Sequence, residues 1–448
     1  MAINYYSALT QVVLVGFVCF LCPGMFNAVS GLGGGGQLDT TAANNASTAL
    51  YSTFIVFGVA GGGIVNLCGV RWTIFVSGFT YALYSASYIF LNHHPRDPSF
   101  TIASGALLGA GAGVLWAAQG LIMTSYSREE EKGRFIAIFW TIFNLGGVLG
   151  GILPFAINYN SDKDSLSDGV YIAFVVLECL GACMGLTLAP PAKVKRLDGT
   201  SVVLAESTSP AREAVEIVKL FLNPTMLALL PMCFTSNFFY TYQFNRINAG
   251  LFNIRTRGFN NIFYWGSQMV GSCLISLLLD TPRFKRKVRG FLAFAVVFVF
   301  FNSIWGGSLA LHNKYPQGIE PGSRIDFKES SKASGAIVLY VLCGASDALF
   351  QSLAYWIIAS LTRDNQKLSR YVGFYKGIQS LGSTVAWQLD IKVSPLTQLI
   401  TNWALFGGSV IPMLWVIWSI KDHEEAAVKA DDAELSEKDA LTDVSVNA

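Results

Sequence analysis

Three ionisable residues lie inside long apolar runs of this sequence, where a charge is costly unless it lines a cavity or meets a partner. Asp347 stands near the middle of one run, and Gln351 follows it by four residues, so a helix places both on one face. Glu178 is central in an earlier run, and Lys376 lies in the run after Asp347. A carboxyl in such a place can take up and release a proton as its surroundings change. Asp347 is therefore the preferred candidate for proton coupling.

Each of these residues also has a structural interpretation. A buried acid can serve only as a hydrogen-bonding group in the helix packing, or the expected end of a helix can be misplaced. For Asp347 both interpretations stay open, and for Glu178 the structural one is favoured. Lys376 is expected to reach the membrane interface with its ammonium group. An ion pair of Lys376 across a central cavity is the alternative.

Neutral hydrogen-bonding side chains occur at similar depths in the apolar runs. Most such residues hold membrane helices together, and a minority contact the transported molecule. The candidates for contact with a solute are Gln119, Asn144, Gln243, Gln268 and Gln379.

The sequence contains no catalytic, metal or cofactor motif. Cys19 and Cys22 have a metal-like spacing, but no histidine or further cysteine accompanies them, so helix packing is predicted. Gly33 to Gly36 follow no strand and precede no Lys-Ser/Thr pair, so a flexible exterior loop is predicted instead of a phosphate cradle. We therefore expect no enzyme activity, no metal or cofactor, and no nucleic-acid partner.

Apolar helices must position these polar residues. Hydrophobic residues make up 52% of the 448 residues and charged residues only 13%, about half the usual share in a soluble domain. At about 20 residues per span, the pattern predicts an all-α multi-pass membrane protein with twelve transmembrane helices. They are predicted at 9–28, 48–69, 72–91, 101–126, 134–157, 169–189, 225–245, 257–279, 290–311, 334–360, 371–390 and 398–420.

A charged turn occurs twice and divides the chain into two like halves. The turn from Ser127 to Arg134 (SREEEKGR) returns from Thr362 to Arg370 (TRDNQKLSR), and the apolar residues that follow also match. Such a parallel repeat is typical of secondary transporters. The predicted parts are a six-helix half at 1–189, a cytoplasmic linker with an amphipathic surface helix at 190–224, a second six-helix half at 225–420, and a disordered acidic tail at 421–448.

The distribution of Lys and Arg predicts that both termini are cytoplasmic. With that orientation the cytoplasmic segments hold 20 basic residues and the exterior connections hold 10. Three arginines on the predicted outside do not follow this positive-inside distribution: Arg246, Arg255 and Arg257. Asn45 begins a glycosylation sequon that also falls outside, so Asn45 is a candidate glycosylation site.

The turn between the second and third helices resembles a degenerate form of the major facilitator superfamily signature Gly-x-x-x-Asp-x-x-Gly-x-Arg. The matching residues are Gly62, Asn66, Gly69 and Arg71. In that signature the glycines allow close helix approach, and the acid and the arginine latch one conformation. Asn66 replaces the acid here, which weakens the latch. The corresponding turn of the second half keeps an acid and a base, Asp280 and Arg283.

Further segments resemble the fungal branch of the uncoordinated-93-like (Unc-93-like) family. These segments are Trp116–Gly120, Asn237–Asn245, Phe252–Gly258, Leu279–Asp280 and Tyr375–Gly382. The resemblance covers nearly the whole chain and implies a major-facilitator fold of two pseudo-symmetric six-helix halves. Fungal members are regarded as transporters, and animal members are described as ion-channel regulators or trafficking chaperones.

We therefore expect a secondary transporter that moves a small solute across a lipid bilayer by alternating access, with proton coupling as a further hypothesis. The alternative is a non-transporting membrane protein that regulates or escorts an ion channel or another membrane-protein partner. The central acids favour transport, and the loss of the acid at Asn66 favours the alternative.

Overall fold

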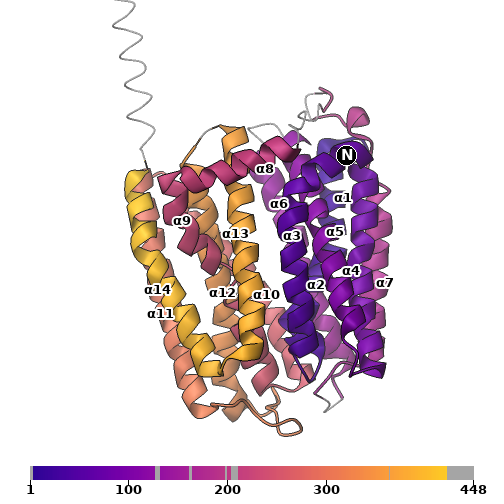
Figure 1. Cartoon of the computed structure of the whole chain (residues 1–448), viewed down its shortest axis with the longest axis vertical. Helices are drawn as coiled ribbons and strands as arrows, with labels where there is room; N and C mark the ends of the chain where they lie inside the picture. Colours follow the sequence, from indigo (N-terminus) through magenta and orange to yellow (C-terminus); the bar gives the residue numbers. More distant parts are fainter. Residues whose placement is uncertain are drawn as a thin grey trace, which may run out of the picture.

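The computed structural model is a bundle of long helices aligned side by side (Figure 1). It describes residues 4–126, 132–160, 164–196, 199–202, 210–362 and 364–420. Within these residues, ten helical segments are long and apolar enough to cross a membrane, and the bent pair Ala214–Leu222 with Pro224–Thr235 raises the number to eleven. The chain is thus an all-α multi-pass membrane protein.

The first half begins with a broken helix. Its helices are α1 (Ala8–Leu21), α2 (Pro23–Gly31), η1 (Gly34–Gly36), α3 (Thr41–Cys68), α4 (Val70–His93), α5 (Ser99–Tyr126), α6 (Lys132–Ile157) and α7 (Asp168–Gly185). The predicted first helix is interrupted at Cys22, because Pro23 has no N–H to continue the hydrogen-bond ladder and starts α2 instead.

The second half also begins with a broken helix. Its helices are α9 (Pro224–Thr235), the π-helix η4 (Tyr242–Ala249), α10 (Ile254–Leu279), α11 (Arg286–Lys314), α12 (Ser330–Ser360), α13 (Asn365–Lys392) and α14 (Pro395–Ser419). The prediction of one continuous helix at 225–245 is wrong. Thr235 and Ser236 donate side-chain hydrogen bonds to the carbonyls of Pro231 and Cys233, and such bonds compete with the helical ladder where α9 ends. At 28 residues α13 is long enough to span, but it is too polar to count among the apolar spans.

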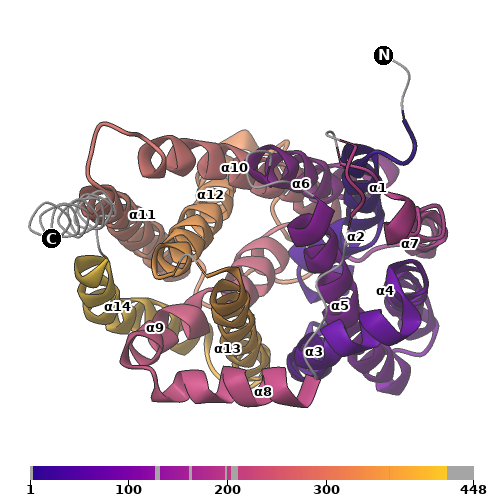
Figure 2. The same cartoon turned by 90° about the horizontal axis from the view of Figure 1, so that it is seen from above.

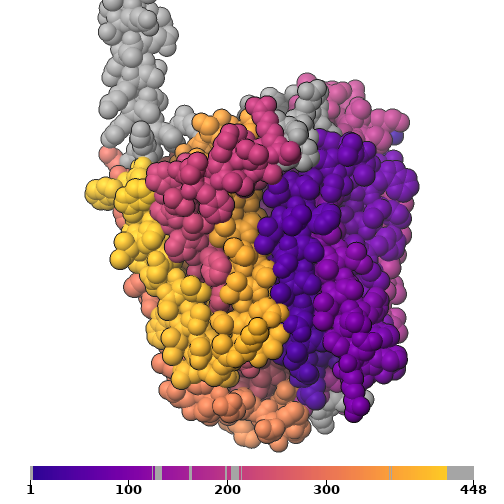
Figure 3. Space-filling model, viewed as in Figure 1, coloured from indigo at the N-terminus to yellow at the C-terminus, as the bar shows by residue number. Residues whose placement is uncertain are grey.

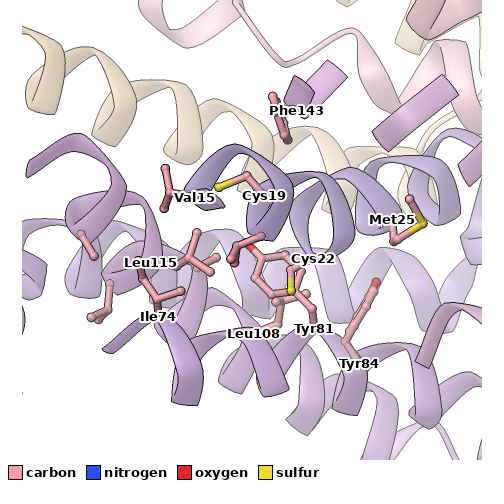
Figure 4. Packing of buried hydrophobic residues seen from close by; sticks show 14 of the residues in the cluster. Val15, Cys19, Cys22, Met25, Ile74, Tyr81, Tyr84, Leu108, Leu115 and Phe143 are labelled. Carbon is pink, nitrogen blue, oxygen red and sulfur yellow. The ribbon is translucent and has the colours of Figure 1, made fainter. Parts of the chain in front are cut away.

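Each half has its own apolar core, and two helix pairs make the most extensive contacts between the halves. One core is built mainly from α1 to α7, and the other from α9 to α14 with η4. Figure 4 shows part of the first core, where Cys19 and Cys22 lie among apolar side chains. All eight cysteines of the chain, each within the described residues, are free. Between the halves, α3 packs against α13 and α6 packs against α10.

Glycines bring α6 close to two neighbours at once. A Cβ on Gly147 would lie 2.7 Å from the Trp265 side chain of α10, and a Cβ on Gly146 would lie 3.0 Å from Gly24 of α2. Small residues allow helices to pack this closely, and Gly150 and Gly151 continue the close contacts one turn further along α6. α6 therefore approaches α10 closely at Gly147, and Phe155 packs against Phe259 further along the same helix.

The linker crosses the boundary between the halves at one end of the bundle. After η2 (Pro191–Lys193), α8 (Pro210–Lys219) and η3 (Leu220–Leu222) lie along the edge of the bundle beside α13 and α3 (Figures 2 and 3). Ile217 packs inward and Val218 is exposed, so α8 is amphipathic as expected. We call this end the linker end and the opposite end the far end.

Both chain ends, as far as the structure describes them, lie at the linker end (Figure 1). The starts of α6 and α13, which follow the repeated charged turns, lie there too, as the two-fold repeat requires. Residues 127–131 of the first turn, residue 363 of the second and the expected disordered tail at 421–448 lie outside the described residues.

Candidate functional site

Asp347 is fully buried in α12 and accepts three hydrogen bonds. Oδ2 accepts from the Tyr240 hydroxyl at 2.7 Å and from Nε2 of Gln268 at 2.6 Å. Oδ1 accepts from Nε2 of Gln351 at 2.6 Å, which confirms that Asp347 and Gln351 share a helix face. The three donors come from the break after α9, from α10 and from α12 itself.

The hydrogen-bond network continues into α13. Nε2 of Gln379 lies 3.3 Å from Oε1 of Gln351 and 3.0 Å from both Ser236 Oγ and Asn237 Oδ1. Nζ of Lys376 donates to Oε1 of Gln379 at 2.8 Å. We call this group the Asp347 cluster, and its members are Ser236, Asn237, Tyr240, Gln268, Asp347, Gln351, Lys376 and Gln379.

Lys376 points into the bundle, which corrects the expectation that it reaches the membrane interface. Its ammonium nitrogen lies 5.5 Å from the centre of the Tyr355 ring and 5.4 Å from that of Tyr375, so two aromatic faces stabilise the charge. Among the described residues, Lys376 and Asp347 form no direct salt bridge, and the Gln379 and Gln351 amides stand between them.

The Asp347 cluster lies at the break of the first helix of its half. Ser236, Asn237 and Tyr240 all come from this break, and the π-helix η4 follows it. π-Helical turns are frequent at functional sites. The first half has its own break at Cys22. In secondary transporters, interrupted helices in corresponding positions of the two halves line the binding site.

The remaining polar candidates lie apart from the Asp347 cluster. Gln119 is buried in α5, Asn144 is half-buried in α6, and Glu178 is fully buried in α7. Oε1 of Gln243 in η4 accepts from the Tyr264 hydroxyl at 2.8 Å. None of the four forms a hydrogen bond to the Asp347 cluster within the part of the chain that the structure describes.

The predicted latch after α3 is tied to α7. Gly69 ends α3 with a φ of 76°, which suits glycine, and Asn66 lies in the last turn of α3 before it. Nε and Nη2 of Arg71 donate to the Leu186 carbonyl at 3.2 and 2.6 Å. Arg71 therefore binds the end of the sixth span of its own half.

Two other latch expectations are only partly met. Gly62 has open space beside it, and the close contact with α5 is made by Gly61, where a Cβ would lie 2.7 Å from Ala117. Asp280 and Arg283 both lie exposed in the turn between α10 and α11. The structure does not change the assignment of these residues as latch candidates, which remains a prediction.

The far end is closed by contacts that the sequence analysis did not predict. The carbonyls at the C-terminal end of α2 are capped by side chains of the second half. Asn261 donates to Ala28 at 2.6 Å, Asn248 and Tyr340 donate to Gly31 at 2.9 Å each, and Arg257 donates to Leu32 and Gly33. Such carbonyls otherwise lack partners, and a cation at a helix C-terminus is stabilising. We call this set of contacts the α2 clamp.

The segment Gly33–Gly36 is a buried turn, so the prediction of a flexible exterior loop is wrong. All four glycines have positive φ values between 54° and 87° and are buried. A Cβ on Gly33 would lie 2.1 Å from the Phe244 carbonyl oxygen of η4. Glycine is required here because the turn is both left-handed and packed against the other half.

A second far-end contact centres on Asp390 of α13. Oδ2 of Asp390 accepts from Asn44 of α3 at 2.6 Å and from Asn245 of η4 at 2.8 Å. Nε of Arg246 lies 2.9 Å from Oδ1. The neighbouring Asn45 lies near the start of α3 and accepts a hydrogen bond from Gln388 at 3.0 Å, a placement between the halves that does not favour glycosylation.

Asp326, in the connection after α11, binds the start of α10. It accepts hydrogen bonds from Arg255 and from Nδ2 of Asn253, the latter at 2.6 Å. Burial tends to raise the pKa of Asp326, but hydrogen bonds from Asn253, from the Lys328 backbone N–H and from Arg255 outweigh it and hold the pKa below its ordinary value. Arg255 also donates to the Tyr159 carbonyl of the first half at 2.9 Å.

The chain is similar to known membrane proteins along nearly its whole length. A profile of the family described as "Ion channel regulatory protein UNC-93" matches residues 35–411. UNC93-like protein 1 of Arabidopsis thaliana is 49% identical over 405 residues, which cover 90% of this chain and 88% of the relative. An UNC93-like protein of Schizosaccharomyces pombe is 44% identical over 422 residues, which cover 93% of this chain and 83% of the relative.

The fold matches a solved transporter. The structure titled "Partially occluded inward open conformation of the xylose transporter XylE from E. coli" aligns with a TM-score of 0.62 and 14% sequence identity, and the alignment covers 94% of this chain and 99% of that one. At this identity the likeness shows the major-facilitator fold alone.

Proposed function

Because this chain belongs to the UNC-93 family and has the major-facilitator fold, we propose that it is a secondary transporter that moves a small polar solute by alternating access. The Asp347 cluster is the proposed site of solute binding and proton coupling. The single observation that carries the proposal is a buried carboxyl with three side-chain donors at the break of a transmembrane helix.

The chemistry of the Asp347 cluster supports a solute rich in hydroxyl or amide groups. Tyr240, Gln268, Gln351 and Gln379 supply donors and acceptors that rotate without changing charge. A solute entering the cluster replaces the hydrogen bonds that these side chains now make to one another. Asp347 then gains or loses donors, and its affinity for a proton changes with the occupancy of the site.

The contacts of the far end support a two-state cycle. We propose that 1–189 and 225–420 move as two halves joined by the linker 190–224, and that both termini lie in the cytoplasm. In that orientation the α2 clamp and the Asp390 contact close the outside. Opening the far end requires that Arg257 leave the α2 carbonyls and that Asn44 leave Asp390.

The family description also supports a second function. "Ion channel regulatory protein" fits a membrane protein that binds and regulates or escorts another membrane protein. Asn66 in place of the latch acid is the observation in this chain that favours it, because a chain that does not cycle between states has no need of the latch.

Reconstitution in sealed vesicles tests both functions. Purified full-length protein is screened for uptake of polar metabolites with and without an imposed pH gradient. We expect gradient-driven accumulation by the wild type and by Glu320→Gln, an exposed control acid, and none by Asp347→Asn. Accumulation by Asp347→Asn that equals the wild type removes the coupling role. If no solute moves and a membrane protein copurifies in fixed ratio, the regulatory function replaces transport.

A further inference from the structure

Glu178 is a buried carboxyl for which the structure shows no partner. Its side chain is fully buried in α7, and neither carboxyl oxygen has a hydrogen-bond partner among the described residues. The hydroxyl of Ser85 on α4 is the polar group that approaches this carboxyl, but the two do not form a hydrogen bond of ordinary geometry. An ionised carboxylate without a hydrogen bond or counter-charge is very costly in such a place, whereas a neutral carboxyl is tolerated.

The surroundings of Glu178 contain no basic side chain. The titratable side chains close enough to interact electrostatically with Glu178 are Cys22 at the helix break, Tyr81 of α4 and Cys179 of α7, and Cys19 of α1 lies beside Cys22 and Tyr81. The other elements packed against α7 add none, because α2 has no titratable residue and α6 has none after Arg134. The basic residues of α4 are bonded at the two ends of α7, Arg71 to the Leu186 carbonyl and His93 to Asp168, so neither balances a carboxylate at Glu178.

The wall beside Glu178 is the break of the first helix. Cys22, the residue between α1 and α2, donates through its thiol to the Glu178 backbone carbonyl at 3.4 Å. A Cβ on Gly181, one turn along α7, would lie 2.7 Å from the Cys22 sulfur, so the break and α7 are in tight contact. At its other end α2 is held by the α2 clamp, chiefly through Arg257.

From this geometry we infer that Glu178 is a proton-binding site of the first half, loaded while the far end is closed and emptied when the α2 clamp opens. Release of the clamp lets α2 swing about Cys22 and lets water reach the carboxyl. The Oε–H bond of Glu178 then breaks, the proton passes to a water molecule, and a hydrated carboxylate remains. A role of Glu178 in proton-coupled transport rests on the proposed function, whereas the protonation of Glu178 in the closed state does not.

Infrared spectroscopy of the protein in lipid nanodiscs tests the site without any transport assay. Glutamate labelled with ¹³C at the side-chain carboxyl shifts only glutamate bands. Glu178 is fully buried, whereas Glu216 is half-exposed and Glu320 and Glu329 are exposed. At neutral pH we expect a labelled band of a protonated carboxyl that disappears in Glu178→Gln and stays in Glu329→Gln, an exposed control. If the spectrum contains only carboxylate bands, Glu178 is ionised and the inference fails.

The clamp variant Arg257→Gln tests whether the proton depends on the state of the far end. Its Glu178 band should disappear at a lower pH than in the wild type, because the open state favours the carboxylate. An identical titration in Arg257→Gln and wild type would make Glu178 a structural acid. If sodium or potassium removes the band at constant pH, the site binds a metal cation and the inference of a proton site is refuted.

Discussion

Replacing Arg257 by glutamine should loosen the far end. The guanidinium is fully buried and donates to the carbonyls of Leu32 and Gly33, and to that of Asp164 at 3.0 Å. A glutamine amide is shorter and reaches at most one of these acceptors. In the closed state of the variant, the carbonyls that lose Arg257 are left without a donor. In the open state water hydrates them, so the substitution destabilises the closed state more than the open state.

The size of the effect follows from the number of hydrogen bonds lost. A hydrogen bond from a charged group contributes about 1.5–3 kcal/mol. Removing the guanidinium from water costs several kcal/mol, and this cost offsets most of the stabilisation that the three hydrogen bonds provide. We expect the opening equilibrium to shift by about 2–3 kcal/mol, or roughly 30- to 160-fold.

Hydrogen–deuterium exchange in nanodiscs measures this shift directly. The amides of residues 28–36 should lose protection by that factor in Arg257→Gln, while those of the α4 and α12 interiors keep theirs. Arg324→Gln is the matched control, since Arg324 is a half-buried far-end arginine whose Nε and Nη1 have no partner in the described structure. Equal exchange in Arg257→Gln and Arg324→Gln would refute the clamp, as would a uniform loss of protection throughout the protein.

Three further substitutions test other parts of the molecule. Asp347→Asn keeps the size of the side chain but cannot titrate, so exchange of solute should persist while accumulation driven by a pH gradient is lost; accumulation equal to that of the wild type would contradict this. Gly382→Val forces a side chain onto the Phe234 carbonyl, 2.0 Å from an ideal Cβ, and should lower the free energy of unfolding by about 2–3 kcal/mol; an unaltered melting temperature would disprove the close packing. The pKa of Asp326 is lowered in the folded protein, so its contribution to the free energy of unfolding is complete above its unfolded pKa, about 3.9, and is lost as the pH falls further. Asp326→Asn should lower the melting temperature at neutral pH, because the pairing with Arg255 is lost. The melting temperature of this variant should also decline less in acid than that of the wild type.

The apolar pattern located most of the helices, because most lipid-spanning segments carry about 20 largely apolar residues, α13 being the polar exception. It did not show that two of these helices are broken. Pro23 was a visible signal for the first break. The break after α9 had a weaker signal. Ser236 competes locally for the Cys233 carbonyl, as serine can in many intact helices, and the partner of Asn237, Gln379, is brought near only by the fold.

The Asp347 cluster was predictable in part. The spacing of Asp347 and Gln351 alone placed them on one face, and the structure adds Tyr240 and Gln268 from other helices. The position of the Lys376 ammonium was not predictable, because a flexible lysine can reach either the membrane surface or an interior amide. Which it reaches depends on Gln379 and two aromatic rings, whose positions are set by tertiary packing.

The arginines that fit the orientation rule poorly turn out to be bonded within the far end. Arg246 pairs with Asp390, Arg255 with Asp326, and Arg257 with the α2 carbonyls. The positive-inside rule concerns charges that stay in loops near the membrane surface. Charges held by partners within the protein do not express that preference, so these three do not count against cytoplasmic termini. The excess of arginine on the predicted outside was therefore a sequence signal for the far-end contacts. Three arginines that the positive-inside rule does not explain are explained by the hydrogen bonds and ion pairs with which they close the far end.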